Sequence, residues 1–147
     1  MIQRLQHAVL VRHAHAEWPG YTGADFDRPL TAQGLSDAAA AAEAIRAAGH
    51  HPDLLLTSPA RRTLQTSEII ATTLALPARA VTTVDALYNA SAYILESELR
   101  KALRLADTVM VVAHNPGISG LARMLTGNPD RPALRPSHWL HVHRPGD

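Results

Sequence analysis

The stretch AVLVRH at residues 8–13 joins four apolar residues to an arginine and a histidine. Short apolar runs rich in β-branched residues are typical of buried strands in a parallel sheet. Cationic or imidazole groups follow apolar runs twice more, in SPARRTLQT at residues 58–66 and in VVAHNPG at residues 111–117. Because ligands of open α/β sheets bind beyond the carboxyl ends of the strands, we expect these groups to converge on one small anion, such as a phosphoryl group. They are Arg12, His13, Arg62 and His114.

Helix signals lie between the apolar runs. Thr31 is the expected N-cap of an alanine-rich helix at residues 31–48. Ser58, followed by Pro59 at the first helical position, is the expected N-cap of a helix that ends at about residue 76. Residues 92–105 predict a third helix with an apolar stripe. The stripe consists of Ile94, Leu95, Leu99 and Leu103.

The remaining segments complete an alternation of strands and helices. Besides the first run, we expect strands at residues 53–57, 80–84, 107–113 and 139–143, a short helix at residues 116–125, and a loop at residues 14–30. Alternating strands and helices are typical of a sheet covered by helices on both faces. The sequence therefore predicts an α/β fold, a three-layer αβα sandwich with a mostly parallel central sheet.

Bulk properties limit the classes of protein. The 147 residues fall in the size range of one domain, and a formal net charge of +1 argues against a broad nucleic-acid surface. The chain has no cysteine, which excludes disulfides and thiolate chemistry and fits a cytoplasmic protein. Its apolar runs are shorter than the ~20 residues of a membrane span, and its first residues lack the apolar region of a signal peptide. We expect no nucleic-acid or membrane partner.

The order of the motifs resembles the histidine phosphatase superfamily, also called phosphoglycerate-mutase-like. That family has Arg-His-Gly after the first strand, an arginine preceding Gln-Thr on the second helix, and a second histidine after a late strand. Within it, RPLTAQG at residues 28–34 and LYNA at residues 87–90 are similar to segments of the small SixA-like phosphohistidine phosphatase branch. Ala14 stands where the family usually has glycine. Since alanine is also small, we expect the site to tolerate it.

The resemblance implies a phosphoglycerate-mutase-like fold and one histidine phosphatase domain over residues 1–147, without a large capping insertion. It also implies that His13 is the nucleophile, forming a phosphohistidine that water hydrolyses, and that His114 is its partner. Arg12 and Arg62 would each offer a fork of donors to phosphate oxygens. Further candidates for substrate binding are Asp25, Arg28 and Ser58. Asp25, Asp27 and Arg28 are the charged residues in the second half of the loop at residues 14–30. The alternative interpretation is that these three side chains only solvate the loop.

The general acid for the leaving group is missing from the expected place. Larger members of the superfamily carry a glutamate after the third strand, whereas VDALYNA at residues 84–90 offers only Asp85. A phosphoramidate leaves as imidazole of near-neutral pKa and needs less proton donation than an alkoxide does. The chain also has little sequence left for a cap over the site. Both points favour phosphohistidine on a protein, such as a phosphotransfer domain or a phosphocarrier, as the substrate.

Other functions remain open at this stage. The same four core residues would serve a phosphatase of small phosphoesters, and a mutase or a non-catalytic phosphate-binding module is a weaker alternative. We expect no cofactor and no metal ion. The histidine pairs at residues 13–15 and 141–143 each offer only two ligands, and metal sites usually need three or four that converge.

Overall fold

Five strands form one central sheet in this computed structural model, which describes residues 5–18, 20 and 22–143. The strands are β1 (His7–Arg12), β2 (Leu54–Thr57), β3 (Val81–Thr83), β4 (Thr108–Ala113) and β5 (Trp139–His143). Their order across the sheet is β3-β2-β4-β1-β5. The first four strands are parallel, and β5 pairs antiparallel with β1. The mostly parallel sheet is the one that the apolar runs predicted.

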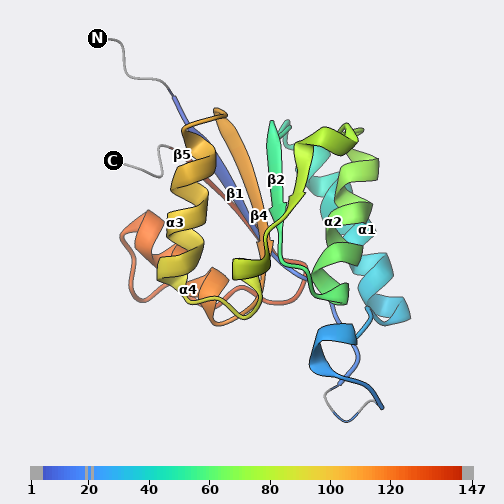
Figure 1. The fold of residues 1–147 in the computed structure, drawn as a ribbon. Helices are drawn as coiled ribbons and strands as arrows, with labels where there is room; N and C mark the ends of the chain where they lie inside the picture. The colour runs from blue at the N-terminus through green and yellow to red at the C-terminus, as the bar shows by residue number, and fades with distance from the viewer. Residues whose placement is uncertain (1–4, 19, 21, 144–147) are drawn as a thin grey trace.

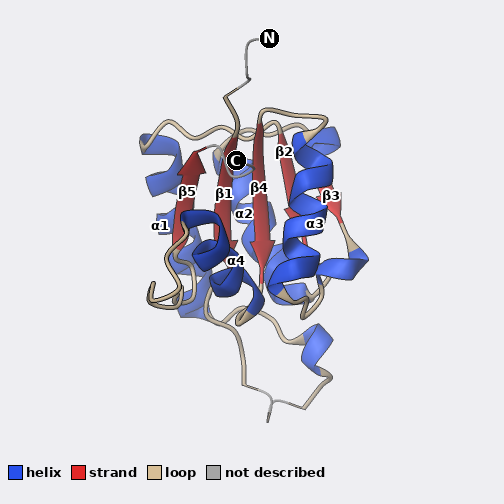
Figure 2. Cartoon of the chain, turned by 90° about the vertical axis from the view of Figure 1, so that its left-hand side faces the viewer, coloured by secondary structure: helices blue, strands red, loops and turns tan. Residues whose placement is uncertain are grey.

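Helices cover both faces of the sheet. They are α1 (Ala32–Ala47), α2 (Arg61–Thr73), α3 (Ala92–Leu103) and α4 (Gly117–Thr126). Helices α1 and α2 lie on one side of the strands, and α3 and α4 lie on the other (Figure 1). A view turned by 90° shows the strands side by side behind α3 and α4 (Figure 2). The predicted three-layer αβα sandwich is therefore confirmed. Among the described residues, none of the helices has both the length and the apolar character needed to cross a bilayer.

Alternation along the strands divides the core into two apolar clusters. Leu10 and Val111 point to the face covered by α3 and α4, where Leu95, Leu99 and Leu121 meet them. The alternate positions of β1 and β4 point to the opposite face of the sheet. There Val9, Val11, Met110 and Val112 pack against Ile45 and Ile70. Because both faces are buried, β1 is apolar from Ala8 to Val11 and β4 from Val109 to Ala113, and the polar residues of both strands stand only at their ends.

The expected helix starts are confirmed for α1 and corrected for α2. The Thr31 hydroxyl accepts a hydrogen bond from the Gly34 amide at 3.0 Å, as an N-cap should. Ser58 and Pro59, in contrast, lie before the helix, which begins at Arg61 after Ala60. The buried Ser58 hydroxyl accepts a hydrogen bond from the Ala60 amide at 3.4 Å and lies 2.7 Å from Nε2 of His114, so it joins the approach to α2 with the second histidine. The expected helix end at residue 76 is also corrected, since α2 ends at Thr73.

The apolar stripe of α3 is confirmed for three of its four residues. Leu95, Leu99 and Leu103 are buried, with exposed fractions of at most 5%. Ile94 is 44% exposed and does not belong to the stripe. Residues 95, 99 and 103 are separated by one helical turn each and share a face, which the neighbouring position 94 does not share.

The sheet register brings three strand ends to the same edge. Strand β4 lies between β1 and β2, with Arg12 paired to Ala113 and Thr57 paired to Val112. The next residues in the chain are His13, His114 and Ser58. The convergence expected from the sequence therefore follows from the hydrogen-bonded pairing of the strands.

Helix α1 is packed closely against the segment that follows His13. A Cβ atom added at Gly34 would overlap the carbonyl oxygen of His15, which is backbone and cannot swing away. We therefore predict that Gly34→Ala lowers the free energy of unfolding by about 1–3 kcal/mol, although alanine favours helix. Gly120→Ala in α4 is the control, because its Cβ would meet only that of Ala92, at 3.1 Å. Urea denaturation measures both, and equal stabilities for the two variants would contradict the prediction.

Candidate active site

His13 follows β1, and a hydrogen bond to the backbone determines which of its two ring nitrogens carries the proton. Its side chain is 8% exposed, and its Nδ1 lies 2.7 Å from the carbonyl oxygen of Ala14. A carbonyl oxygen only accepts hydrogen bonds, so in the neutral ring the proton is on Nδ1 and the lone pair is on Nε2. Ala14 is buried, and its backbone φ angle is not positive, so the position does not require glycine. Alanine therefore fits where the related sequences usually have glycine.

The surroundings of His13 keep its ring neutral. Burial is the main cause that lowers its pKa from 6.5 to about 4, and the charges of Arg62 and Arg12 lower it further. The hydrogen bond to Ala14 opposes this shift only in part. At neutral pH, His13 thus has an unprotonated Nε2, as an attacking nitrogen requires.

His114 follows β4 and lies beside His13. The centroids of the two rings are 5.4 Å apart, and the ring planes are tilted by 59°. Burial, followed by the charge of Arg62, lowers the pKa of His114 from 6.5 to about 3. His114 is therefore neutral before an anion binds. A phosphoryl dianion between the rings would favour the protonated form, because opposite charges close together stabilise each other.

Arg62 supplies a guanidinium group from the first turn of α2. Its side chain is 4% exposed, and its Nη1 donates to the carbonyl oxygen of Asp25 at 2.8 Å. The preceding Arg61 is exposed, so of the two neighbouring arginines only Arg62 is buried beside Asp25. Arg12 donates from Nη1 to the carbonyl oxygen of Leu134 at 3.0 Å. Within the described part of the chain, the buried Nε atoms of both arginines have no hydrogen-bond partner.

Asp25 joins the site from the 3₁₀ helix η1 (Asp25–Asp27). Its carboxylate accepts hydrogen bonds from Tyr88 at 2.6 Å, from Arg28 at 2.8 Å and from Arg62 at 3.2 Å. These donors, Tyr88 first, hold the pKa of Asp25 well below its usual range. Arg28 also donates from Nε to the carbonyl oxygen of Glu17, which fixes the loop.

Tyr88 is a site residue to which the sequence assigned no role. Its ring stands edge-on to that of His114, with centroids 5.8 Å apart, and its hydroxyl donates to Asp25. The segment LYNA at residues 87–90 was recognised, but nothing in it marks the tyrosine as polar support for an aspartate 63 residues earlier. Asp85, which stood in place of the missing acid, is exposed.

The Gln-Thr pair of α2 holds the two loops that surround the site. The Gln65 side-chain oxygen accepts from the Leu30 amide at 2.7 Å, and the Thr66 hydroxyl accepts from the Ala14 amide at 3.1 Å. Thr66 lies one turn beyond Arg62 on α2, so one helix places a guanidinium group and also fixes the backbone beside His13.

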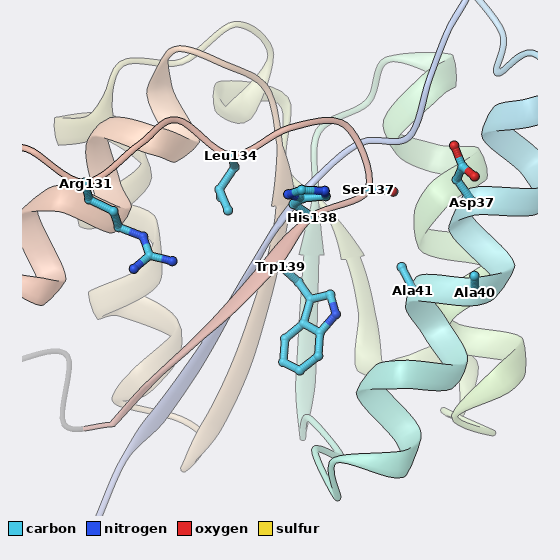
Figure 3. A pocket seen from close by; sticks show the side chains of 8 residues that line it. All are labelled: Asp37, Ala40, Ala41, Arg131, Leu134, Ser137, His138 and Trp139. Carbon is cyan, nitrogen blue, oxygen red and sulfur yellow. The ribbon is translucent and has the colours of Figure 1, made fainter.

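Residues 134–138 support Arg12 through backbone contacts. Besides the Leu134 carbonyl, the Ser137 amide lies within hydrogen-bond distance of the carbonyl oxygens of Arg12 and His13, at 3.2 and 3.1 Å. The other side of this segment borders a cavity of about 430 Å³ (Figure 3). The cavity is lined by Asp37, Ala40, Ala41, Arg131, Leu134, Ser137, His138 and Trp139. Its lining does not include Arg12, His13, Arg62 or His114.

The histidine pairs do not assemble a larger ligand set. His15, from the first pair, lies 2.8 Å from the hydroxyl of Thr31. His141, from the second, lies 2.8 Å from Nδ1 of His7 at the opposite end of β1. Among the described residues, no group of three or more histidine, aspartate or glutamate side chains is placed to hold a metal ion.

The motifs, the fold and the geometry agree with one family. The chain belongs to the histidine phosphatase superfamily (branch 1), whose family model matches residues 8–104. An uncharacterized chloroplastic protein of Arabidopsis thaliana is 31% identical over an alignment of 129 residues, with 81% of this chain and 58% of that protein covered. An uncharacterized protein of Mycobacterium tuberculosis is 34% identical over 115 residues, or 78% of this chain and 69% of that protein. The chain thus spans 58% of the length of the Arabidopsis relative.

Solved structures share the fold over nearly the whole chain. One from Agrobacterium tumefaciens, provisionally assigned as the phosphohistidine phosphatase SixA, has a TM-score of 0.80 and 26% identity and covers 92% of this chain and 90% of its own. Another provisionally assigned SixA, from Nakamurella, has a TM-score of 0.75 and 28% identity and covers 98% and 87%. These similarities confirm the expected phosphoglycerate-mutase-like fold.

The two neighbouring arginines of α2 allow a matched test of phosphate binding. We predict that Arg62→Ala lowers kcat/KM for p-nitrophenyl phosphate by ~10²-fold or more, since it removes a donor to the oxygens that carry charge in the transition state. Arg61→Ala removes the same charge from an exposed position and should change the value by less than about threefold. Steady-state kinetics with both variants checks this. A larger loss in Arg61→Ala would contradict the assignment.

The buried imidazoles predict a loss of stability in acid. Because the pKa values of His13 and His114 fall from 6.5 to about 4 and about 3, the unfolded chain binds more protons than the folded chain below pH 6.5. Each ring then lowers the free energy of unfolding by about 2 kcal/mol at pH 5 relative to pH 7.5. Replacing His13 with asparagine should remove its share. Urea denaturation at both pH values tests this, and an unchanged pH difference in His13→Asn would contradict it.

Proposed function

We propose that this protein is a metal-independent phosphatase that works through a phosphohistidine intermediate on His13. The observation that carries the proposal is the hydrogen bond from Nδ1 of His13 to Ala14, which leaves an unprotonated Nε2 beside two arginines and a second histidine. The membership of the chain in the histidine phosphatase superfamily supports the same activity.

The reaction has two displacement steps. In the first, Nε2 of His13 forms a bond to phosphorus, and the bond to the leaving group breaks with its electron pair going to that group. In the second, a water oxygen attacks the phosphorus, and the P–N bond breaks with its electron pair returning to Nε2. The water loses its two protons to product and solvent, and His13 is neutral again. The hydrogen bond to Ala14 keeps the ring in one orientation throughout.

The other core residues bind the phosphoryl oxygens. Arg12 and Arg62 each retain N–H groups beyond those that already donate to backbone carbonyls. His114, when protonated in the presence of the dianion, donates to a third oxygen, and Ser58 holds its Nε2 at 2.7 Å. Because phosphoryl transfer depends mainly on position and charge, this set is sufficient for the chemistry.

We propose phosphohistidine on a protein as the substrate. Asp25 is the carboxylate that contacts Arg62, and its lowered pKa makes it ionised at neutral pH, so it has no proton to give. A site whose carboxylate is ionised suits a P–N bond better than an alkyl phosphate, whose alkoxide must be protonated as it leaves. The similarity to structures provisionally assigned as SixA supports this class of substrate.

Trapping the intermediate tests the mechanism. We predict that wild-type protein mixed with ³²P-labelled substrate and quenched within the first turnover carries a phosphoryl group that is labile in acid and stable in base. His13→Ala should lose both the label and turnover. His15→Ala is the control, since it removes an exposed imidazole two residues away. Label on any other residue, found by peptide mapping, would show that His13 is not the nucleophile.

The choice of substrate is tested separately. We predict that kcat/KM for a phosphohistidine peptide or phosphocarrier exceeds that for alkyl phosphate monoesters by at least about tenfold, or ~1.4 kcal/mol. Phosphate release from both substrates at neutral pH gives the comparison. Equal or faster hydrolysis of the monoesters would favour a phosphatase of small molecules that uses the same residues.

A further inference from the structure

The carboxylate of Asp25 is exposed on one side and held on the other. Its side chain is 41% exposed, whereas that of its partner Arg62 is 4% exposed. Oδ2 accepts from Arg62 and Tyr88, and Oδ1 accepts from Arg28. A carboxylate has about four acceptor positions, so the contacts within the described residues leave one on Oδ1. Asp25 can therefore accept a hydrogen bond from a bound molecule without releasing the residues that hold it.

The charged and titratable groups around Asp25 keep it ionised. Arg28 faces it from its own turn, Arg62 from α2 and the Tyr88 hydroxyl from the segment after η3 (Asp85–Leu87). Asp25 in turn acts electrostatically on His114, whose pKa it raises slightly against the larger effect of burial. A fixed negative charge thus stands within electrostatic reach of the His114 imidazole.

A phosphorylated imidazole has a use for such a charge. When its second ring nitrogen is protonated, the P–N bond can break with its electron pair passing to the ring, which leaves as neutral imidazole and keeps its N–H. No proton is transferred in that step, so a general acid is not needed. An anion that accepts a hydrogen bond from this N–H stabilises the imidazolium form, which is the reactive one.

We propose that Asp25 determines the specificity of the site by accepting, at the open position of Oδ1, a hydrogen bond from the N–H of the substrate's phosphorylated imidazole. This inference rests on the proposed phosphohistidine phosphatase function. The same negative charge disfavours leaving groups that depart as anions, such as p-nitrophenolate. Asp25 therefore selects between two kinds of phosphoryl compound that bind the same arginines.

The ratio of two activities tests this role. The probes are N-phosphorylimidazole and p-nitrophenyl phosphate, and the measured quantity is kcat/KM for the first divided by that for the second. Asp25→Asn should lower this ratio by about tenfold or more, as expected when the acceptor of a charge-assisted hydrogen bond loses its negative charge. Asp27→Asn is the matched control, because Asp27 is an exposed aspartate on the same short helix. It should leave the ratio at the wild-type value.

The ratio separates specificity from support of Arg62. If Asp25 acted only by positioning Arg62, Asp25→Asn would lower both activities in the same proportion, and that result would overturn the inference while leaving the proposed function intact. If the wild-type protein hydrolysed p-nitrophenyl phosphate but neither N-phosphorylimidazole nor a phosphohistidine peptide, the proposed substrate class itself would be wrong. Asp25→Ser, checked for folding by circular dichroism, is the second variant and should show the same fall.

The pH dependence gives an independent measurement. An ionised Asp25 favours the protonated substrate, so kcat for N-phosphorylimidazole should persist to higher pH in the wild type than in Asp25→Asn. The alkaline limb of the profile should therefore move to lower pH in the variant and stay in place in Asp27→Asn. Identical alkaline limbs in wild type and Asp25→Asn would overturn the inference.

Discussion

The parallel pairing of β4 with both β1 and β2 is the constraint on which the rest of the molecule depends. It brings the segments that carry His13, Ser58 and His114 to one edge of the sheet. Slipping either pair by one residue would turn its alternating side chains to the wrong face, and both apolar clusters would be disrupted. The packing that fixes the register of the strands thereby fixes the distance between the two imidazole rings.

The site keeps two guanidinium groups, those of Arg12 and Arg62, in partly or fully buried positions by hydrogen-bonding each of them to the protein. A buried guanidinium is costly unless it is hydrogen-bonded. Arg62 is compensated by the backbone and carboxylate of Asp25, and Arg12 by the carbonyl of Leu134. Each arrangement uses only part of the guanidinium fork, so donors remain for an anion. The same buried positive charge contributes to keeping His13 neutral, so the arginines also influence the protonation state of the neighbouring imidazole.

Local signals explain why so much could be predicted from the sequence. An apolar run followed by Arg12 and His13 already defines a strand and its end, and parallel topology then brings such ends together. The Thr31 cap was predictable for the same reason, since its bond spans three residues. Ser58 carried an equally good cap signal, yet α2 begins only at Arg61, and a serine beside proline gives no sign that its hydroxyl contacts a histidine 56 residues later. Tyr88 and the backbone of residues 134–138 were not predictable, since long-range contacts and backbone donors have no side-chain pattern.

Residues 134–138 connect Arg12 to a cavity outside the candidate site. One side of the segment holds Arg12 through the Leu134 carbonyl and the Ser137 amide, and the other borders the cavity next to α1 (Figure 3). A compound that filled this cavity would press on the backbone that sets the position of the guanidinium group, without competing with phosphate. Inhibitors of two kinds are thus conceivable for one site, and only one kind would have to carry the negative charge that makes phosphate mimics poor at entering cells.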